Sequence, residues 1–247
     1  MKVSIITAVY NGGHAIAETL RSVAEQDYSD IEHIVIDGAS SDDTVAVVRS
    51  NGNRVALLVS EPDNGVYDAF NKGLRRATGN AIGFLNCGDT YLSRSVVSRI
   101  AQELSVPGTE AVFGDLLIVN AQRQTQVVRR YNSRRFTPDM MRYGLMPAHP
   151  TLFLRREVYQ RVGEYDTQFR IAGDFELCLR VFALNIVRYR YIPEPLVSMP
   201  RGGLSNRGWR STWQITREMH RACAHNGVRT NWAKLNLRIP LKIIEMF

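Results

Sequence analysis

The sequence predicts an α/β protein built around a mostly parallel sheet. Three apolar runs end abruptly in small polar loops and have the character of buried strands: Val3–Val9, His33–Ile36 and Ala81–Leu85. Between them lie segments whose apolar residues have helical spacing. Such alternation of strand and helix is typical of a parallel sheet. Because parallel strands deliver their following loops to one edge, we expect the polar residues after these strands to lie together and to bind a ligand.

The first strand runs into the loop Tyr10–Gly13, and Ile16, Leu20 and Val23 then fall on one helical face. The second strand ends at Asp37. The elements expected next are, in order, a helix around residues 45–48, a strand at 55–59, a turn at 60–65, a helix at 66–77 and the strand at 81–85. The edge of the predicted sheet should therefore carry Thr7, Asp37 and Asp89.

The pattern changes after about residue 104, where strands become more frequent than helices. The expected elements are strands at 111–115, 116–119 and 126–128, an extended segment at 147–156, a helix at 157–162 and an amphipathic helix opened by the turn 171–174. We therefore expect one α/β domain over residues 1–206, followed by a basic, amphipathic helical extension over 207–247.

Charge is concentrated in that last segment. The chain has 247 residues and a net charge of +7. Residues 207–247 hold two acidic side chains, Glu218 and Glu245, against eight basic ones: Arg207, Arg210, Arg217, Arg221, Arg229, Lys234, Arg238 and Lys242. A nearly neutral body with a basic end predicts an anionic surface as the partner of that end.

Composition also suggests where the protein works. The longest apolar runs fall well short of the roughly 18 residues expected of a membrane-spanning helix. Lys2 leads directly into a strand, without the apolar core of a signal peptide. Cys87, Cys178 and Cys223 are odd in number and widely spaced, so we expect reduced thiols. These features predict a cytoplasmic protein.

Several motifs in this order give the chain a resemblance to a known family. The motifs are Ser4–Thr7 with Tyr10-Asn11, Asp37–Ser40 with Asp43-Thr44, Glu61–Gly73, Phe84–Asp89, Phe153–Arg156 and the Gly173-Asp174 turn. Together they resemble family 2 glycosyltransferases with the GT-A fold, a Rossmann-like, mostly parallel sheet. The resemblance is nearest to the bacterial exopolysaccharide type, including colanic-acid enzymes, and extends to about residue 205.

The resemblance implies a reaction. Enzymes of this family move a sugar, with inversion, from a nucleoside-diphosphate sugar to a saccharide acceptor, which can be lipid-linked, in surface-polysaccharide biosynthesis. The positions implied for donor binding are Thr7, Tyr10, Asn11, Asp37, Asn64, Asn71, Lys72 and Asn86. Asp37 matches the position that contacts the nucleotide base. The loop 201–205 could close over the phosphates, or it could be a simple surface turn.

The resemblance also implies a divalent metal, Mg²⁺ or Mn²⁺, bound by Asp89. Hard oxygen ligands suit these ions, which neutralise a diphosphate as it leaves. Asn86 and Gly88 stand where further carboxylates are common in the family, so phosphates and water would have to complete the shell. A plain turn is the other interpretation of Asp89. His149 could complete the metal shell or could be structural.

Asp174 matches the catalytic base of the family. A carboxylate there would take the proton of the acceptor hydroxyl, which is worth about 10²- to 10⁴-fold in rate. Asp at a helix start is also a good N-cap, and one residue can do both. Glu176 is the fallback base.

Two other classes of function stay open at this point. A nucleotidyltransferase shares acidic residues at strand ends, but it would need a cationic phosphate loop after the first strand, where Tyr10–His14 has none of the required Lys or Arg. A nucleic-acid-binding module would use the basic tail, but it would leave Asp37, Asp89 and Asp174 unexplained. We therefore expect no nucleic-acid partner.

The tail is expected to dock on the inner face of the cell membrane as an interfacial helix. Apolar residues alternate there with arginines: Trp209, Trp213, Ile215 and Met219 with Arg210, Arg217 and Arg221. Residues 239–244 add a second apolar and basic patch. Packing of the same apolar residues on the catalytic domain is the other interpretation.

Overall fold

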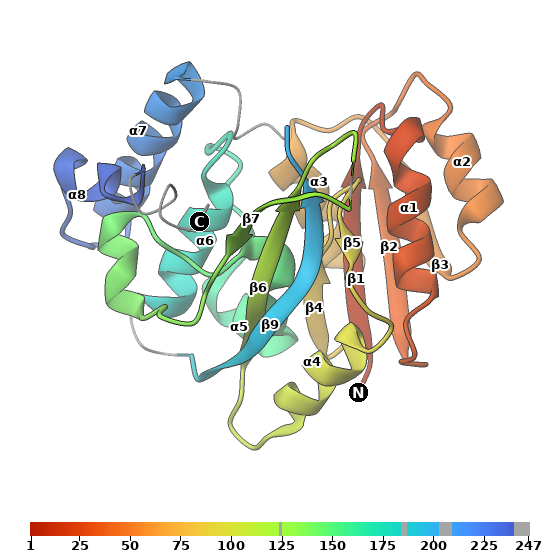
Figure 1. Cartoon of the computed structure of the whole chain (residues 1–247), viewed down its shortest axis with the longest axis horizontal. Coiled ribbons are helices and arrows are strands. Elements are labelled where there is room, and N and C mark those ends of the chain that lie inside the picture. The colour runs from red at the N-terminus through yellow and green to blue at the C-terminus, as the bar shows by residue number, and fades with distance from the viewer. Residues whose placement is uncertain (124, 184–186, 203–208, 240–247) are drawn as a thin grey trace.

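One nine-stranded sheet organises the chain (Figure 1). The computed structural model describes residues 1–123, 125–183, 187–202 and 209–239. The strand order is β3-β2-β1-β4-β8-β6-β9-β5, with β7 added beside β6. Helices cover both faces of this sheet, so the predicted α/β class is confirmed.

The first half of the sheet is parallel, as predicted. Its strands are β1 (Val3–Val9), β2 (Ile31–Asp37), β3 (Val55–Ser60) and β4 (Ala81–Phe84). In the register of β1, Val9 lies opposite Asp37 of β2 and Ile6 lies opposite Phe84 of β4. The carboxyl ends of these strands therefore meet at one edge, which is the edge where the predicted site residues begin.

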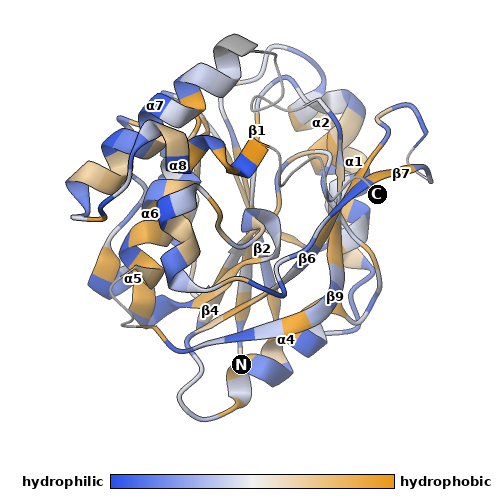
Figure 2. Cartoon of the chain, turned by 60° about the vertical axis from the view of Figure 1, so that its left-hand side comes forward, coloured by the Kyte–Doolittle hydropathy of each residue, from blue (hydrophilic) through white to orange (hydrophobic). Residues whose placement is uncertain are grey.

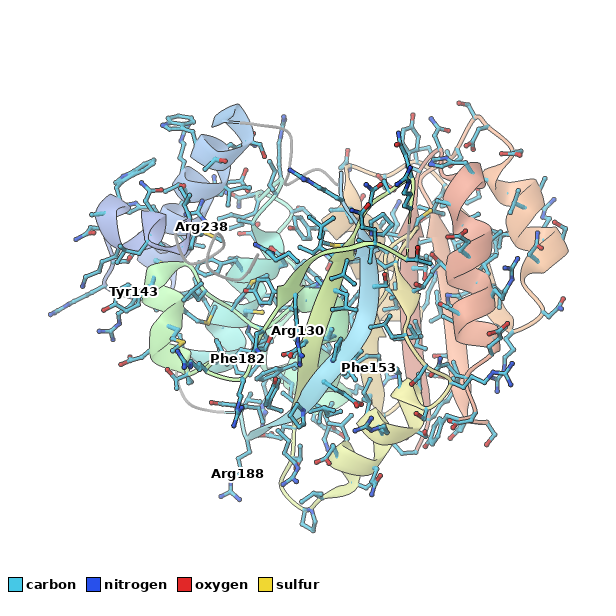
Figure 3. The ribbon with its side chains drawn as sticks, viewed as in Figure 1. Arg130, Tyr143, Phe153, Phe182, Arg188 and Arg238 are labelled. Atoms are coloured by element: carbon cyan, nitrogen blue, oxygen red, sulfur yellow. The ribbon has the colours of Figure 1, made fainter. Side chains whose placement is uncertain are left out.

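The second half of the sheet is mixed. Its strands are β5 (Thr90–Tyr91), β6 (Ala111–Val119), β7 (Val127–Tyr131), β8 (Phe153–Arg155) and β9 (Tyr189–Pro200). Strand β8 runs antiparallel between β4 and β6, where Gly83 makes room for the Phe153 ring (Figure 3). The two short strands expected within 111–119 are one strand, and β9, which pairs in parallel with β6, was not predicted.

Alternate side chains of the strands face the two helical layers. The helices are α1 (Gly13–Ala24), α2 (Thr44–Asn51), α3 (Val66–Arg76), α4 (Val96–Ser105), α5 (Arg156–Val162), α6 (Gly173–Phe182), α7 (Trp209–His225) and α8 (Trp232–Asn236), with 3₁₀ turns η1 (Pro138–Tyr143) and η2 (His149–Thr151). Ile6 and Ile36 pack with α3 and α6, whereas Val9 and Val35 pack with α1 and α2.

The helices of the tail pack on the domain. Met219, Ala222 and Cys223 of α7 and Leu235 of α8 are buried in the same apolar cluster as α6. In Figure 2 hydrophilic residues alternate with apolar ones along the ribbon of α7. None of the helices in the described ranges is long and apolar enough to cross a membrane. Of the two interpretations of the tail, membrane docking and packing on the catalytic domain, packing is thus correct for Met219. Residues 240–247 of the tail lie outside the described part of the chain.

A buried clamp joins the two halves of the domain. The side-chain Nδ2 of Asn71, on α3, donates to the Tyr165 carbonyl at 2.8 Å, and Asn71 Oδ1 accepts from the Tyr165 N–H at 2.9 Å. The ring of Tyr165 then packs against Phe84 and Tyr67, with centroids 5.2 and 5.6 Å away. Asn71 is 4% exposed. Its amide is therefore a structural element, and contact of Asn71 with the donor stays a prediction.

We predict that Asn71→Ala lowers the free energy of unfolding by about 2–4 kcal/mol, because it leaves two buried backbone groups without partners. Urea denaturation followed by circular dichroism measures this. Asn53→Ala, at an exposed loop position, is the control and should change stability by less than about 0.5 kcal/mol. Equal stability of the two variants would contradict the clamp.

Candidate functional site

A cavity of about 550 Å³ opens at the carboxyl edge of the sheet. Five of the predicted site residues line it: Tyr10, Asn86, Asp89, His149 and Asp174. A second cavity, of about 260 Å³, adjoins it and shares Asn86, His149, Ile171, Asp174 and Met199. We call these the central cavity and the side cavity. A groove of about 580 Å³ between residues 168–170 and α7 contains none of the predicted site residues.

Thr19 of α1 shapes the turn that presents Asn86 and Asp89. Its hydroxyl donates to the Asp89 carbonyl and accepts from the Gly88 N–H, both at 2.9 Å. Gly88 has φ of +92°, a conformation that a residue with a Cβ rarely adopts. Thr19 was not among the predicted site residues, although a polar residue beside the apolar face of α1 is visible in the sequence.

Asp89 is a buried carboxylate whose charge is poorly compensated. It is 3% exposed, and its Oδ2 has no hydrogen-bond partner within the described chain. Burial raises the pKa of Asp89 to about 7, and hydrogen bonds from Asn86 only partly oppose this shift. The side-chain Oδ1 of Asn86 is likewise buried without a partner in the described ranges. Two oxygens that lack partners thus belong to one turn.

These two oxygens fit a hard divalent cation. Mg²⁺ and Mn²⁺ prefer carboxylate and carbonyl oxygens, and Mg²⁺ keeps phosphate and water ligands beside one or two protein groups. Burial raises the pKa of the Cys87 thiol in the same turn to about 12, so no thiolate competes. Within the described residues no group of three or more His, Cys, Asp or Glu side chains could hold a metal alone. Asp89 and Asn86 would therefore need oxygens from a ligand.

His149 is buried in an aromatic cluster. Its Nε2 shares a hydrogen bond of 2.8 Å with the Tyr165 hydroxyl, and its ring lies 5.8 Å from the centroids of Phe70 and Phe84. Burial lowers the pKa of His149 to about 4, so the ring is neutral near pH 7. Because Nε2 is hydrogen-bonded to Tyr165, the predicted contact of His149 with a metal would have to be made by Nδ1.

Asp174 lies in the first turn of α6 and lines both cavities. One carboxylate oxygen accepts from the Phe175 N–H at 2.8 Å, and the Tyr67 hydroxyl lies 3.4 Å from it. The same hydroxyl donates to the Ile171 carbonyl at 2.7 Å. Burial, and then the Asp174 charge, raises the pKa of Tyr67 well above its ordinary value, so Tyr67 stays a donor. Asp174 is not the N-cap that the sequence suggested, since Ala172 occupies that position.

Glu218 of α7 holds the turn that precedes Asp174. Its Oε2 accepts from the backbone N–H groups of Ile171 and Ala172, at 2.9 Å each. Its Oε1 accepts from the side chain of Gln214 at 3.0 Å. A helix of the tail thus provides hydrogen-bond partners for backbone groups at the start of α6. No local sequence signal could have revealed this contact, because it spans more than 40 residues.

Glu176 is occupied elsewhere. It is 5% exposed, forms an ion pair with Arg180 at 2.7 Å and accepts from Asn226. It lines neither cavity. Its predicted role as fallback base is therefore wrong for this structure.

Asp37 and Thr7 lie beneath the edge and line neither cavity. Asp37 is fully buried and accepts hydrogen bonds from the Ser40 N–H and hydroxyl and from the Ser60 hydroxyl. Thr7 is fully buried with its hydroxyl 3.0 Å from His33 Nε2. Both side chains are paired within the protein, and contact of Asp37 with a base and of Thr7 with the donor stay predictions.

The remaining predicted donor residues organise loops. The backbone N–H of Asn11 donates to Ser40, and its side-chain Oδ1 accepts from the Ser41 N–H at 2.9 Å. Asn64 is exposed, and its N–H donates to Asp68. Lys72 Nζ donates to the Pro62 carbonyl at 2.6 Å and lies 3.3 Å from Glu61, so its charge is already compensated away from the cavity.

Two arginines line the central cavity, Arg170 and Arg201. Arg201 belongs to the loop that was expected to close over phosphates, of which residues 203–205 lie outside the described part. Arg170 was not predicted. The feature of the sequence that could have identified Arg170 is its position, four residues before the predicted base Asp174.

Comparison with known proteins now identifies the family. Residues 4–163 match the family model "Glycosyl transferase family 2". The chain belongs to this family. It is 35% identical over 182 residues to an uncharacterized glycosyltransferase of Mycobacterium tuberculosis, covering 72% of this chain and 68% of that protein. It is 28% identical to a PGL/p-HBAD biosynthesis glycosyltransferase of Mycobacterium bovis, covering 82% and 78% of the two chains.

Solved structures share the GT-A fold of this glycosyltransferase. TarS of S. aureus in complex with UDP-GlcNAc superposes with a TM-score of 0.71 at 19% identity, covering 92% of this chain and 69% of that one. Mannosyltransferase PcManGT from Pyrobaculum calidifontis, in complex with GDP-Man and Mn²⁺, gives 0.65 at 24% identity, covering 91% and 63%. The chain is thus a glycosyltransferase. Of the three classes of function that the sequence left open, sugar transfer is correct, rather than nucleotidyl transfer or nucleic-acid binding.

We predict that Asp89→Asn stabilises the metal-free glycosyltransferase in a pH-dependent way. Between the ordinary pKa of 3.8 and the folded value of about 7, the folded state keeps a proton that the unfolded state has released, so wild-type stability falls as pH rises. The advantage of Asp89→Asn should grow over this range to at most about 4 kcal/mol.

Urea denaturation in EDTA from pH 4.5 to 8 measures this difference. Asp27→Asn, which removes a carboxylate from an exposed loop, is the control. If the difference in unfolding free energy between wild type and Asp89→Asn is constant across this pH range, burial does not raise the pKa of Asp89.

Proposed function

We propose that this glycosyltransferase moves a sugar from a nucleoside-diphosphate sugar to a saccharide acceptor with inversion at the anomeric carbon. The observation that supports the proposal most is one cavity lined by two different acidic sites. Asp89, with Asn86, offers unpaired oxygens to a cation, and Asp174 offers a carboxylate held at a helix start. An inverting transfer needs both, at the leaving group and at the attacking hydroxyl.

In the proposed reaction, Asp174 accepts the proton of the acceptor hydroxyl. The hydroxyl oxygen forms the new bond to the anomeric carbon, and the bond from that carbon to the diphosphate breaks with its electron pair on the diphosphate. The Phe175 N–H orients the carboxylate that takes the proton, and the Tyr67 hydroxyl, which donates to the Ile171 carbonyl, lies 3.4 Å from the same oxygen. Glu218 keeps the preceding turn in place through Ile171 and Ala172.

Asp89 and Asn86 would hold Mg²⁺ or Mn²⁺, which supplies charge neutralisation for the departing diphosphate. Arg170 and Arg201 line the same cavity and would pair with phosphate oxygens. Tyr10 is 66% exposed at the mouth of the cavity and is free to stack on a nucleoside. The role in surface-polysaccharide biosynthesis rests on the resemblance of the motifs alone.

Two variants separate the proposed roles. Asp89→Asn should abolish the Mn²⁺-dependent thermal stabilisation by a donor, whereas Asp174→Asn should keep it. Asp174→Asn should reduce turnover by about 10²- to 10⁴-fold, because it removes the base but keeps the shape. UDP-, GDP-, dTDP- and CMP-sugars are screened with Mn²⁺ or EDTA, and released nucleotide is measured in the presence of acceptors. Near-normal turnover of Asp174→Asn would remove it as the base.

The tail would also dock on an anionic membrane surface, as a peripheral contact. Exposed apolar residues gather on its two helices and just after them: Trp213 at 55%, Trp232 at 40%, Leu237 at 49% and Ile239 at 39%. The rings of Trp213 and Trp232 are 6.4 Å apart, and the Arg217 guanidinium lies over Trp213. This surface replaces the predicted one, since Met219 is buried; the side chains of Trp209 and Arg210 lie outside the described part.

Replacement of both tryptophans, Trp213→Ala with Trp232→Ala, should weaken binding to anionic vesicles about tenfold or more, because interfacial binding scales with buried apolar area. Arg217→Gln should weaken it about fivefold, the effect of one basic residue near the surface. Cosedimentation with phosphatidylglycerol and with pure phosphatidylcholine vesicles measures both. Leu92→Ala, which removes another exposed apolar side chain, is the control. Negligible wild-type binding to both vesicle types would exclude the membrane contact.

A further inference from the structure

The side cavity has the position that an acceptor needs. Asp174 lines both cavities, and so does Asn86 of the turn proposed to hold the donor metal. A molecule in the side cavity can therefore present a hydroxyl to Asp174 while the sugar donor occupies the central cavity. Neither the family match, which covers residues 4–163, nor the relatives assign a ligand to this cavity.

Most of the lining of the side cavity is apolar. Leu116 comes from β6, Met146 from the loop before η2, and Met199 from β9, while Ile215 and Met219 come from α7. Methionine side chains are flexible and polarizable, so they adapt to aromatic and aliphatic ligands alike. Asp174 is the one carboxylate among the described residues that line this cavity.

Two polar side chains at its wall, Arg238 and Tyr131, are committed to hydrogen bonds within the protein. Arg238 is 2% exposed, and its guanidinium donates to the Leu235 carbonyl at 2.6 Å and to the Thr216 hydroxyl at 2.8 Å (Figure 3). The Tyr131 hydroxyl donates to the Met146 carbonyl at 2.7 Å. A sugar ring, whose hydroxyls each need a partner, would fit this apolar wall poorly.

We propose that the side cavity binds an apolar aglycone, so that the acceptor of this glycosyltransferase is a glycoside with an aromatic or aliphatic group next to the reacting sugar. This inference rests on the proposed function. A volume of about 260 Å³ accommodates one ring or a short alkyl chain rather than a second saccharide unit. The apolar group would bind against Met146, Ile215 and Met219, and the sugar would extend toward Asp174.

Three glycosides that differ only in the aglycone test this: methyl, phenyl and octyl β-D-glucoside. Binding of each to the full chain is measured by titration calorimetry, and transfer is measured with the donor found by the thermal screen. Phenyl or octyl glucoside should bind about ten- to a hundredfold more tightly than methyl glucoside, because of the apolar area that it buries. The phenyl and octyl arms distinguish an aromatic from an aliphatic aglycone.

Met146→Gln is the test variant, since it makes the cavity wall polar at nearly constant volume. It should remove most of the preference for the apolar aglycone, by about tenfold, and leave binding of methyl glucoside unchanged. Met140→Gln is the matched control. Met140 is also partly buried and lies six residues away, but it does not line the cavity. Circular dichroism and thermal unfolding without ligand show that both variants fold.

Equal binding of the three glucosides by the wild type would overturn the aglycone proposal, and so would the same preference in Met146→Gln as in Met140→Gln. Failure of the proposed function has a different signature, namely no donor-dependent stabilisation and no nucleotide release. The binding measurement decides the aglycone proposal in that case as well, because it needs neither donor nor metal.

Discussion

The site depends on a buried connection between the two halves of the chain. Asn71 of α3 pairs with both backbone groups of Tyr165, and the Tyr67 hydroxyl of the same helix donates to the Ile171 carbonyl. Helix α3 packs on the parallel strands whose ends carry Asp89. These bonds therefore fix the turn before Asp174 relative to the Asp89 turn. The two Asn71 bonds are buried, so breaking them leaves polar groups that water cannot reach, and the Tyr67 bond is partly buried.

Burial of the Asp89 carboxylate lowers the stability of the folded protein, and a bound cation would offset this loss. Its carboxylate is buried and one oxygen has no partner in the described chain, so the folded protein keeps it protonated up to about pH 7. A cation would displace that proton and pair the charge, and its binding free energy would be reduced by the cost of deprotonation near or below this pH. The protein is thus less stable because of an oxygen without a protein partner, and this is the oxygen that the proposed metal binding needs.

The sequence predicted what depends on local pattern. Apolar runs and their loops located β1 to β4 and, with them, the Asp89 turn. Strand β9 was missed because its Pro193 and Pro195 contradict a ladder strand, yet tertiary pairing with β6 holds it. Asn71 and Lys72 were assigned to the donor from a motif, but their partners, Tyr165 and Glu61, are supplied by the folded chain. Contacts between distant segments leave no local signal.

The tail contributes to three parts of the molecule at once. The family match ends at residue 163, so Asp174 and all of α7 lie beyond it. One face of α7 supplies Glu218 to the turn before Asp174, and Ile215 and Met219 of the same helix line the side cavity. Trp213 stays exposed on its outer surface. A shift of α7 would therefore change the position of Asp174, the lining of the proposed acceptor site and the proposed membrane contact together.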